Sequence, residues 1–207
     1  MNSNYLQEIN KKETNPLLVS FVAFAEENKV PIITYEGINF LIQVIKLRNI
    51  KNVLEIGTAI GYSSIAMALK ANVTVTSIER DKKMFDIASE NVKKANVSDK
   101  VTLIYEDALN VDETTLGTFD LIFIDAAKAQ SIKFFEKYET ILSEKGVIVT
   151  DNLLFHGLVD QTVKDRNLRQ LLTKIDRYNK FVVEKVGYDT FIYNLGDGMS
   201  LSIKRSE

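Results

Sequence analysis

The chain contains no cysteine, no tryptophan and a single histidine, His156, among its 207 residues. The absence of cysteine excludes disulfides, thiolate metal sites and cysteine nucleophiles. One histidine excludes a multi-histidine metal centre and disfavours a histidine-based catalytic triad. A metal site in this chain would therefore depend on oxygen ligands.

Long apolar runs and an excess of one charge are also absent. No stretch of 18 apolar residues occurs, and the first residues, MNSNYLQEINKKE, are polar with mixed charge. Both features disfavour a membrane span and a signal peptide, so we expect a cytoplasmic protein without membrane contact. The formal charge of −2 excludes a chain-wide cationic field, so any basic patch for nucleic acid would have to be local.

Proline occurs only at Pro16 and Pro31, and no repeat or low-complexity linker divides the chain. With 45% hydrophobic content, a chain of this length can bury one sizeable core. We predict a single domain, 1–207, in which two helices at about 16–28 and 36–48 precede a core at 51–207.

From residue 51 onward, strand-like and helix-like segments alternate. Segments such as DLIFID and GVIVTD are apolar throughout, as expected for strands that helices cover on both faces. The pattern predicts an α/β fold of the Rossmann-like type, a doubly wound and mostly parallel seven-stranded sheet. Strands are expected at 52–56, 73–78, 101–105, 120–125 and 146–150, and helices from Gly61 and at 81–95, 128–142 and about 161–180.

The last segment, TFIYNLGDGMSLSIKR, breaks this alternation. Two strand-like runs flank the turn Gly196–Gly198, which predicts a hairpin. The hairpin would add an antiparallel strand at the edge of the sheet.

Acidic side chains follow five successive predicted strands. In parallel α/β sheets, ligands bind at the carboxyl ends of the strands, so we expect the functional site at this edge. The side chains in question are Glu55, Glu79, Asp107, Asp125 and Asp151, the last followed by Asn152.

The turn in VLEIGTAIGYSSIAMA has glycines at Gly57 and Gly61, which is neither the dinucleotide-binding spacing nor a phosphate loop. Glu55 before the turn would repel phosphate and attract an ammonium group. Glu79, at the end of the next strand, is placed to accept hydrogen bonds from both ribose hydroxyls. A nucleoside that carries a cationic amino acid fits both acids, which points to S-adenosylmethionine. The alternative is an ordinary strand-turn-helix with exposed acids.

Together, the segments VLEIGTAIGYSS, IERD, EDA, FIDAAK and VTDNLLFHGLV resemble the class I S-adenosylmethionine-dependent O-methyltransferases of the catechol and caffeoyl-coenzyme A type. The resemblance covers nearly the whole chain from about residue 30. It implies that Glu55 lines the methionine end of the cofactor, that Gly57 and Ser63 hold its carboxylate side, that Glu79 binds ribose, and that Asp107 and Ala108 flank adenine. It also implies cofactor contacts for Asp125 and for Ile33 in the segment PIIT.

A second group of residues would carry the reaction. Asp125, Asp151 and Asn152 end neighbouring strands, and a set of oxygen ligands without histidine or cysteine suits Mg²⁺. The family uses the matching positions as metal ligands, and a lysine at the place of Lys128 as general base. The alternatives are helix caps for the acids and a surface lysine at a helix start.

The site chemistry requires an acceptor with two adjacent oxygens, and three functions remain open. The first function, which we favour, is methylation of 5-hydroxyuridine at the tRNA wobble position. A bacterial branch of the family carries out this reaction, and this chain resembles it in the segments LLTKIDRYN, LGDGMSLSIKR and DNLLFHGLV. The second function is methylation of a small catechol-like metabolite. The third is a noncatalytic nucleoside-binding domain.

The tRNA hypothesis predicts a basic surface. Between residues 164 and 185, seven lysines and arginines oppose three acids, so the local charge is about +4. On this hypothesis Arg166 and Arg169 guide an anticodon loop into the pocket. For His156 two roles stay open, contact with the base or simple packing. The alternative is a solvated helix face.

The first predicted helix carries more apolar residues than one helix face needs: Leu17, Leu18, Val19, Phe21, Val22 and Phe24. We therefore expect residues 1–50 to cover the cofactor or to form a homodimer contact. Packing against the sheet is the alternative.

Overall fold

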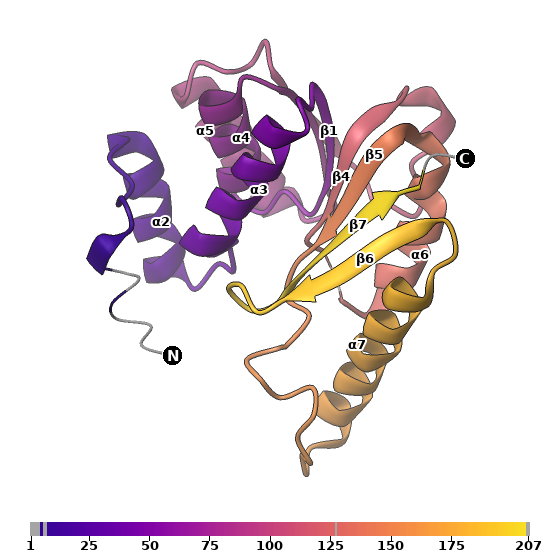
Figure 1. The fold of residues 1–207 in the computed structure, drawn as a ribbon. Helices are drawn as coiled ribbons and strands as arrows, with labels where there is room; N and C mark the ends of the chain where they lie inside the picture. Colours follow the sequence, from indigo (N-terminus) through magenta and orange to yellow (C-terminus); the bar gives the residue numbers. More distant parts are fainter. Residues whose placement is uncertain (1–4, 6–7, 127, 206–207) are drawn as a thin grey trace.

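The computed structural model describes residues 5, 8–126 and 128–205. Its centre is the predicted seven-stranded sheet (Figure 1). The order of the strands in the sheet is β3-β2-β1-β4-β5-β7-β6. The strands are β1 (Asn52–Ile56), β2 (Thr74–Glu79), β3 (Val101–Tyr105), β4 (Phe119–Ile124), β5 (Leu142–Thr150), β6 (Tyr188–Tyr193) and β7 (Met199–Lys204). Strands β1 to β5 are parallel, whereas β7 pairs antiparallel with β5 and β6.

Helices cover both faces of the sheet (Figure 1). One side carries α2 (Pro16–Asn28), α3 (Tyr35–Leu47), α4 (Tyr62–Ala71) and α5 (Lys82–Lys94), and the other carries α6 (Ser131–Tyr138) and α7 (Arg166–Glu184). Short 3₁₀ helices occur at η1 (Glu113–Thr115), η2 (Lys128–Gln130) and η3 (Glu139–Ile141).

The central strands send alternate side chains into two hydrophobic clusters. In β4, Leu121 and Phe123 pack with residues of α2, α3 and α4. Ile122 and Ile124 pack with residues of α6 and α7 on the opposite face. All four side chains are buried, which explains why the strand has no polar alternation.

Two predicted boundaries differ from the structure. The expected helix at 128–142 is divided into η2, α6 and η3, and β5 begins at Leu142 because buried Leu142 pairs with Phe119 before a shift in register. The expected helix at about 161–180 is α7, which starts later because the Asp165 side chain caps it by accepting the Leu168 N–H at 2.7 Å. It also ends later, at Glu184, because Val182 is still buried in the core.

Helix α2 has apolar side chains on more than one face. Leu18, Phe21 and Ala25 are buried, and the helix packs against α4. Val19 and Phe24 are exposed, at 46% and 37% of their surface. The homodimer contact therefore stays a prediction.

Tyr138 connects α6 to the edge of the sheet where the acids lie. Its fully buried hydroxyl donates to the Ala108 carbonyl at 2.6 Å. We expect Tyr138→Phe to lower the free energy of unfolding by about 1–2 kcal/mol, because the carbonyl loses its partner. Urea denaturation of this variant and of Tyr105→Phe, whose side chain is half exposed, measures the difference. Equal stabilities of the two variants would contradict the expectation.

Candidate active site

A cavity of about 1040 Å³ lies at the carboxyl edge of the parallel strands. Its wall combines the ends of β1 to β5 with the linker before α3 and the β6–β7 turn. Ten predicted site residues line it: Ile33, Gly57, Ser63, Glu79, Asp107, Ala108, Asp125, Lys128, Asn152 and His156. Most of the residues predicted for the site therefore lie in one cavity.

The turn after β1 presses against the end of β4. Gly57 has a φ of +102°, and a Cβ at this position would lie 2.2 Å from the Asp125 carbonyl oxygen. The Gly57 N–H donates to the Ile78 carbonyl at 3.0 Å. Only glycine satisfies both the backbone angle and the close approach.

Glu79 is held in place by the backbone around it. One carboxylate oxygen accepts the Ala59 N–H at 2.8 Å, and the other accepts the Asp81 N–H, also at 2.8 Å. Each oxygen can accept a further hydrogen bond. The side chain thus presents a rigid pair of acceptors beside the cavity, which suits a vicinal diol.

Two further features shape this end of the cavity. Helix α4 starts after Gly61 without a side-chain cap, so its first backbone N–H groups can bind a carboxylate. Arg80 lines the cavity and lies 3.4 Å from Asp107. Sequence reasoning missed Arg80, although its position directly after the acid at the end of β2 was a usable signal.

Glu55 lies behind the wall and not in it. Its fully buried carboxylate accepts hydrogen bonds from the hydroxyls of Ser63, Ser64 and Ser77. Burial, together with the negative charge of Asp125, raises the pKa of Glu55 to about 7. The structure therefore differs from the expectation that Glu55 itself lines the methionine end, because Ser63 stands between the acid and the cavity.

The predicted reaction group is assembled at the other end of the cavity. Asp125 Oδ1 accepts hydrogen bonds from Lys128 Nζ and from Asn152 Nδ2, both at 2.9 Å. Asp151 is buried just beneath the wall, and its Oδ1 accepts the Asn152 N–H at 2.7 Å. Burial, and then the charge of Asp125, raises the pKa of Asp151 to about 7.

The described residues contain no cluster of three or more His, Cys, Asp or Glu side chains that could hold a metal. The predicted set has two carboxylates, Asp125 and Asp151, and one amide, Asn152. All three offer oxygen donors from the ends of adjacent strands, and their chemistry fits a hard divalent cation.

The loop after β5 forms the remaining wall and has an unusual backbone. Asn152, Phe155, His156 and Gly157 all have positive φ, from 47° to 72°. A left-handed conformation costs about 1–2 kcal/mol for each residue other than glycine. Such a loop keeps its shape only where its surroundings hold it.

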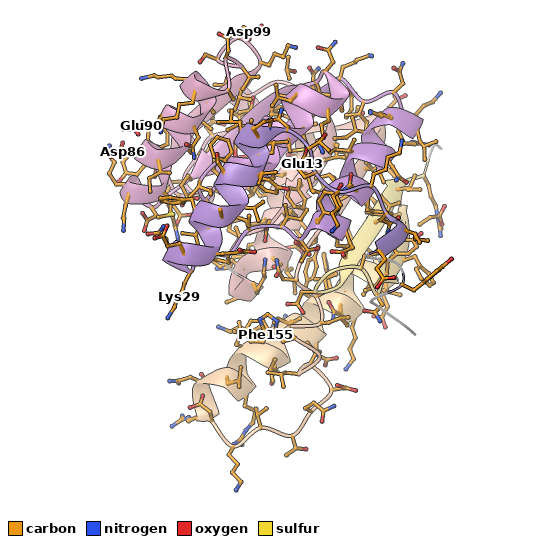
Figure 2. The ribbon with its side chains drawn as sticks, turned by 90° about the vertical axis from the view of Figure 1, so that its left-hand side faces the viewer. Glu13, Lys29, Asp86, Glu90, Asp99 and Phe155 are labelled. Carbon is orange, nitrogen blue, oxygen red and sulfur yellow. The ribbon has the colours of Figure 1, made fainter. Side chains whose placement is uncertain are left out.

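The β6–β7 turn and α7 hold this loop from two sides. The Leu153 and Leu154 N–H groups donate to the carbonyls of Gly198 and Asp197, at 2.9 and 2.8 Å. From α7, Asn179 Nδ2 donates to the Leu153 carbonyl at 3.0 Å. Phe155 lies where the body of the protein meets the projecting α7 (Figure 2).

Arg166 and Arg169 do not line the cavity. Both are exposed in the first turns of α7, which project beyond the sheet (Figure 1). The structure therefore does not bring them together with Asp125 and Lys128.

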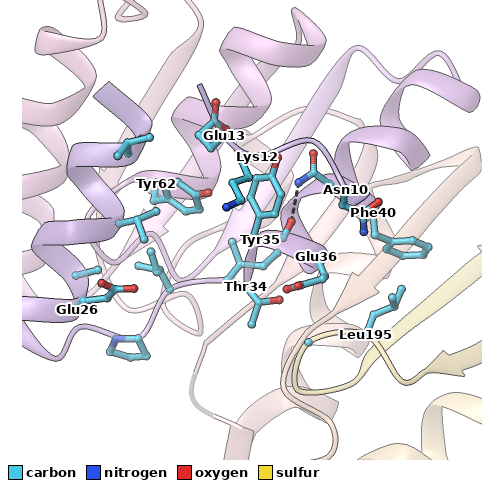
Figure 3. A pocket seen from close by; sticks show the side chains of 18 of the residues that line it. Asn10, Lys12, Glu13, Glu26, Thr34, Tyr35, Glu36, Phe40, Tyr62 and Leu195 are labelled. Atoms are coloured by element: carbon cyan, nitrogen blue, oxygen red, sulfur yellow. Dashed lines mark hydrogen bonds between the residues drawn. The ribbon is translucent and has the colours of Figure 1, made fainter. Parts of the chain in front are cut away.

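A second cavity, of about 1650 Å³, lies between α2, α3 and the β6–β7 turn (Figure 3). Ile33 and Tyr62 line both cavities. The larger one contains none of the acids that follow the strands. We therefore place the chemistry in the smaller cavity.

Comparison with known proteins agrees with this fold. The family model described as O-methyltransferase matches residues 7–205. Caffeoyl-CoA O-methyltransferase of Populus kitakamiensis is 33% identical over 78% of this chain and 73% of its own length. Catechol O-methyltransferase of Niastella koreensis is 29% identical over 97% of this chain and 95% of its own. A crystal structure from Staphylococcus aureus, provisionally named a caffeoyl-CoA O-methyltransferase, is 39% identical, covers 98% of this chain and 96% of its own, and has a TM-score of 0.88.

The fold, the acid-lined cavity and these relatives define an S-adenosylmethionine-dependent enzyme that transfers a methyl group to oxygen. The chain belongs to the O-methyltransferase family, of the caffeoyl-CoA and catechol type. The alternative of a noncatalytic nucleoside-binding domain is therefore set aside. Among the described residues, no helix combines the length and apolar content that crossing a membrane requires.

The buried Glu55 makes stability depend on pH. Because its folded pKa of about 7 lies above the usual 4.5, the group reduces the free energy of unfolding as pH rises from about 4.5 to about 7. We expect Glu55→Gln to remove this decline, which amounts to at most about 3 kcal/mol. Urea denaturation at pH 5 and pH 8 measures it. Parallel pH dependences for wild type and variant would contradict the expectation.

Proposed function

We propose that the protein methylates a hydroxyl group of a small catechol-like molecule, with S-adenosylmethionine as donor and Mg²⁺ as metal. The observation that carries the proposal is the assembly of Asp125, Lys128 and Asn152 in the same cavity as Gly57 and Glu79. The names of the relatives, which refer to catechol and caffeoyl-CoA, support an acceptor with two adjacent oxygens. They favour the small molecule over tRNA.

In this proposal the cofactor occupies the end of the cavity near β1, β2 and β3. Glu79 accepts hydrogen bonds from the two ribose hydroxyls, and Asp107 and Ala108 flank the adenine. The carboxylate of the methionine part binds at the first turn of α4 beside Ser63. Ile33 closes the cavity from the linker before α3, and Asp125 stands near the ammonium group.

Asp125, Asp151 and Asn152 would hold Mg²⁺. When bound, the ion would lower the pKa of a coordinated hydroxyl and orient it through the neighbouring oxygen. The buried Asp151, with its raised pKa, needs a positive partner to be stable as an anion, which supports this assignment.

Lys128 would act as the general base. As a neutral amine, it takes the proton of the acceptor hydroxyl, and the acceptor oxygen then attacks the methyl carbon. The new O–C bond forms as the C–S bond breaks, and the bonding electrons remain on sulfur as a neutral thioether. The residues around the cavity contribute alignment, because displacement requires an in-line approach.

Substitution of Lys128 tests the proposed base. With S-adenosylmethionine, Mg²⁺ and catechol, we expect Lys128→Met to lower kcat by about 10²–10⁴ while the cofactor still binds. The matched control is Lys137→Met, because Lys137 is also a mostly buried, paired lysine but lies outside the cavity. Chromatography of the methyl ether measures turnover. A kcat within threefold of wild type would exclude Lys128 as base, and activity that persists with chelator would exclude the metal.

A second candidate acceptor is 5-hydroxyuridine at the tRNA wobble position. The observation in its favour is the exposed basic group at the start of α7: Lys164, Arg166, Arg169, Lys174 and Arg177. Farther along the helix, Lys180 and Lys185 are paired with Asp176 and Glu139. Within the described part of the chain, the five exposed side chains form no ion pair, and their positive charge could contact phosphate.

The double variant Arg166→Ala/Arg169→Ala separates the two acceptors. If tRNA is the substrate, we expect the variant to methylate tRNA bearing 5-hydroxyuridine at least tenfold less efficiently and to lose part of the salt dependence. Methylation of catechol should not change, because neither arginine lines the cavity. Tritiated S-adenosylmethionine measures both reactions. If wild type labels catechol but not tRNA, the second candidate is wrong.

A further inference from the structure

Asp197 is an acid at the active-site cavity that the proposed chemistry does not use. It lies in the turn between β6 and β7 and lines the cavity together with Asn152 and His156. Its side chain is only 14% exposed. The sequence pattern predicts only a hairpin connection at this turn.

The Asp197 carboxylate holds the left-handed part of the β5–α7 loop. Its Oδ1 accepts the backbone N–H of His156, and its Oδ2 lies 3.9 Å from the His156 ring. The Asp197 carbonyl also accepts the Leu154 N–H, at 2.8 Å. Side chain and backbone of one residue therefore bind the loop at two successive points.

Close packing makes this turn a rigid support. A Cβ at Gly196 would lie 2.5 Å from Oγ1 of Thr34, the N-cap residue of α3. A Cβ at Gly198 would lie 2.5 Å from Cγ of Leu154 in the loop. The turn is thus packed tightly between the start of α3 and the loop. Because Asp197 cannot shift easily, its hydrogen bonds can fix where Leu154–Gly157 lie.

We propose that Asp197 is a positioning residue for the methyl acceptor, because its carboxylate holds the wall Leu154–Gly157 in place through the His156 N–H. The cofactor end of the cavity is built by Gly57, Glu79 and Asp107, whereas the hydrogen bonds of Asp197 described above go to the loop after β5. Loss of this support therefore affects acceptor binding and leaves cofactor binding intact. The inference rests on the proposed function for the location of the acceptor.

The test compares substitutions that keep or remove the hydrogen bond. We expect Asp197→Ala to raise the KM for catechol at least fivefold with a smaller change in kcat. Asp197→Asn has the same side-chain length and keeps one oxygen that can accept the His156 N–H. The KM of this variant should therefore lie within twofold of wild type. The affinity for S-adenosylhomocysteine, measured by calorimetry, should stay within twofold in both.

A matched control is Asp120→Ala. Asp120 Oδ2 also accepts backbone N–H groups, from Lys51 and Asn52 at 2.9 and 3.1 Å, but at the opposite edge of the sheet. We expect this variant to leave the KM for catechol unchanged. If Asp197→Ala does not fold, Asp197→Glu serves instead, because it keeps the charge but displaces the oxygens, and it should also raise KM.

Hydrogen exchange provides a readout that needs no acceptor. The His156 amide should exchange at least tenfold faster in Asp197→Ala than in wild type, and at the wild-type rate in Asp197→Asn. An unchanged KM or exchange rate in Asp197→Ala would overturn the inference, as would equal effects of alanine and asparagine. Wild-type protein inactive on catechol would instead refute the proposed function, while the exchange result would still decide the role of Asp197 in the loop.

Discussion

The structure depends on the contact between the β1 turn and the end of β4. Gly57 approaches the Asp125 backbone so closely that no side chain can be placed between them. The turn proposed to bind the cofactor and the residues proposed for catalysis thus follow two adjacent strands, β1 and β4. In the proposed reaction, the distance between methyl donor and acceptor is then set by the spacing of neighbouring strands.

A buried network of hydrogen bonds supports this contact. Glu55 accepts hydrogen bonds from three serine hydroxyls, and the hydroxyl of one of these serines, Ser77, also lies 2.6 Å from the Thr58 hydroxyl. The network joins β1, β2, the turn and α4. Because each partner is satisfied by another, the turn is held without contributing a charged side chain to the cavity.

Much of the fold, and the acids that end its strands at the cavity, could be predicted from the sequence for identifiable reasons. Buried strands and the acids after them are local patterns, and parallel topology brings those acids to one edge. The start of β5 at Leu142 could not be predicted, because it depends on pairing with Phe119 across a shift in register. The burial of Glu55 could not be predicted either, because it depends in part on a hydrogen bond to Ser77, which is distant in sequence. Asp197 was missed because its contacts are with Leu154 and His156, about 40 residues away in the sequence.

Glu79 illustrates how folding prepares a binding site. Both of its carboxylate oxygens are already immobilised by backbone N–H groups before any ligand arrives. Ordering a glutamate side chain costs about 1.5–2 kcal/mol of rotamer entropy. For Glu79 this cost arises when the protein folds and not when a ligand binds. A nucleoside that binds this carboxylate meets a side chain with little freedom left to lose, so more of its hydrogen-bond energy appears as affinity.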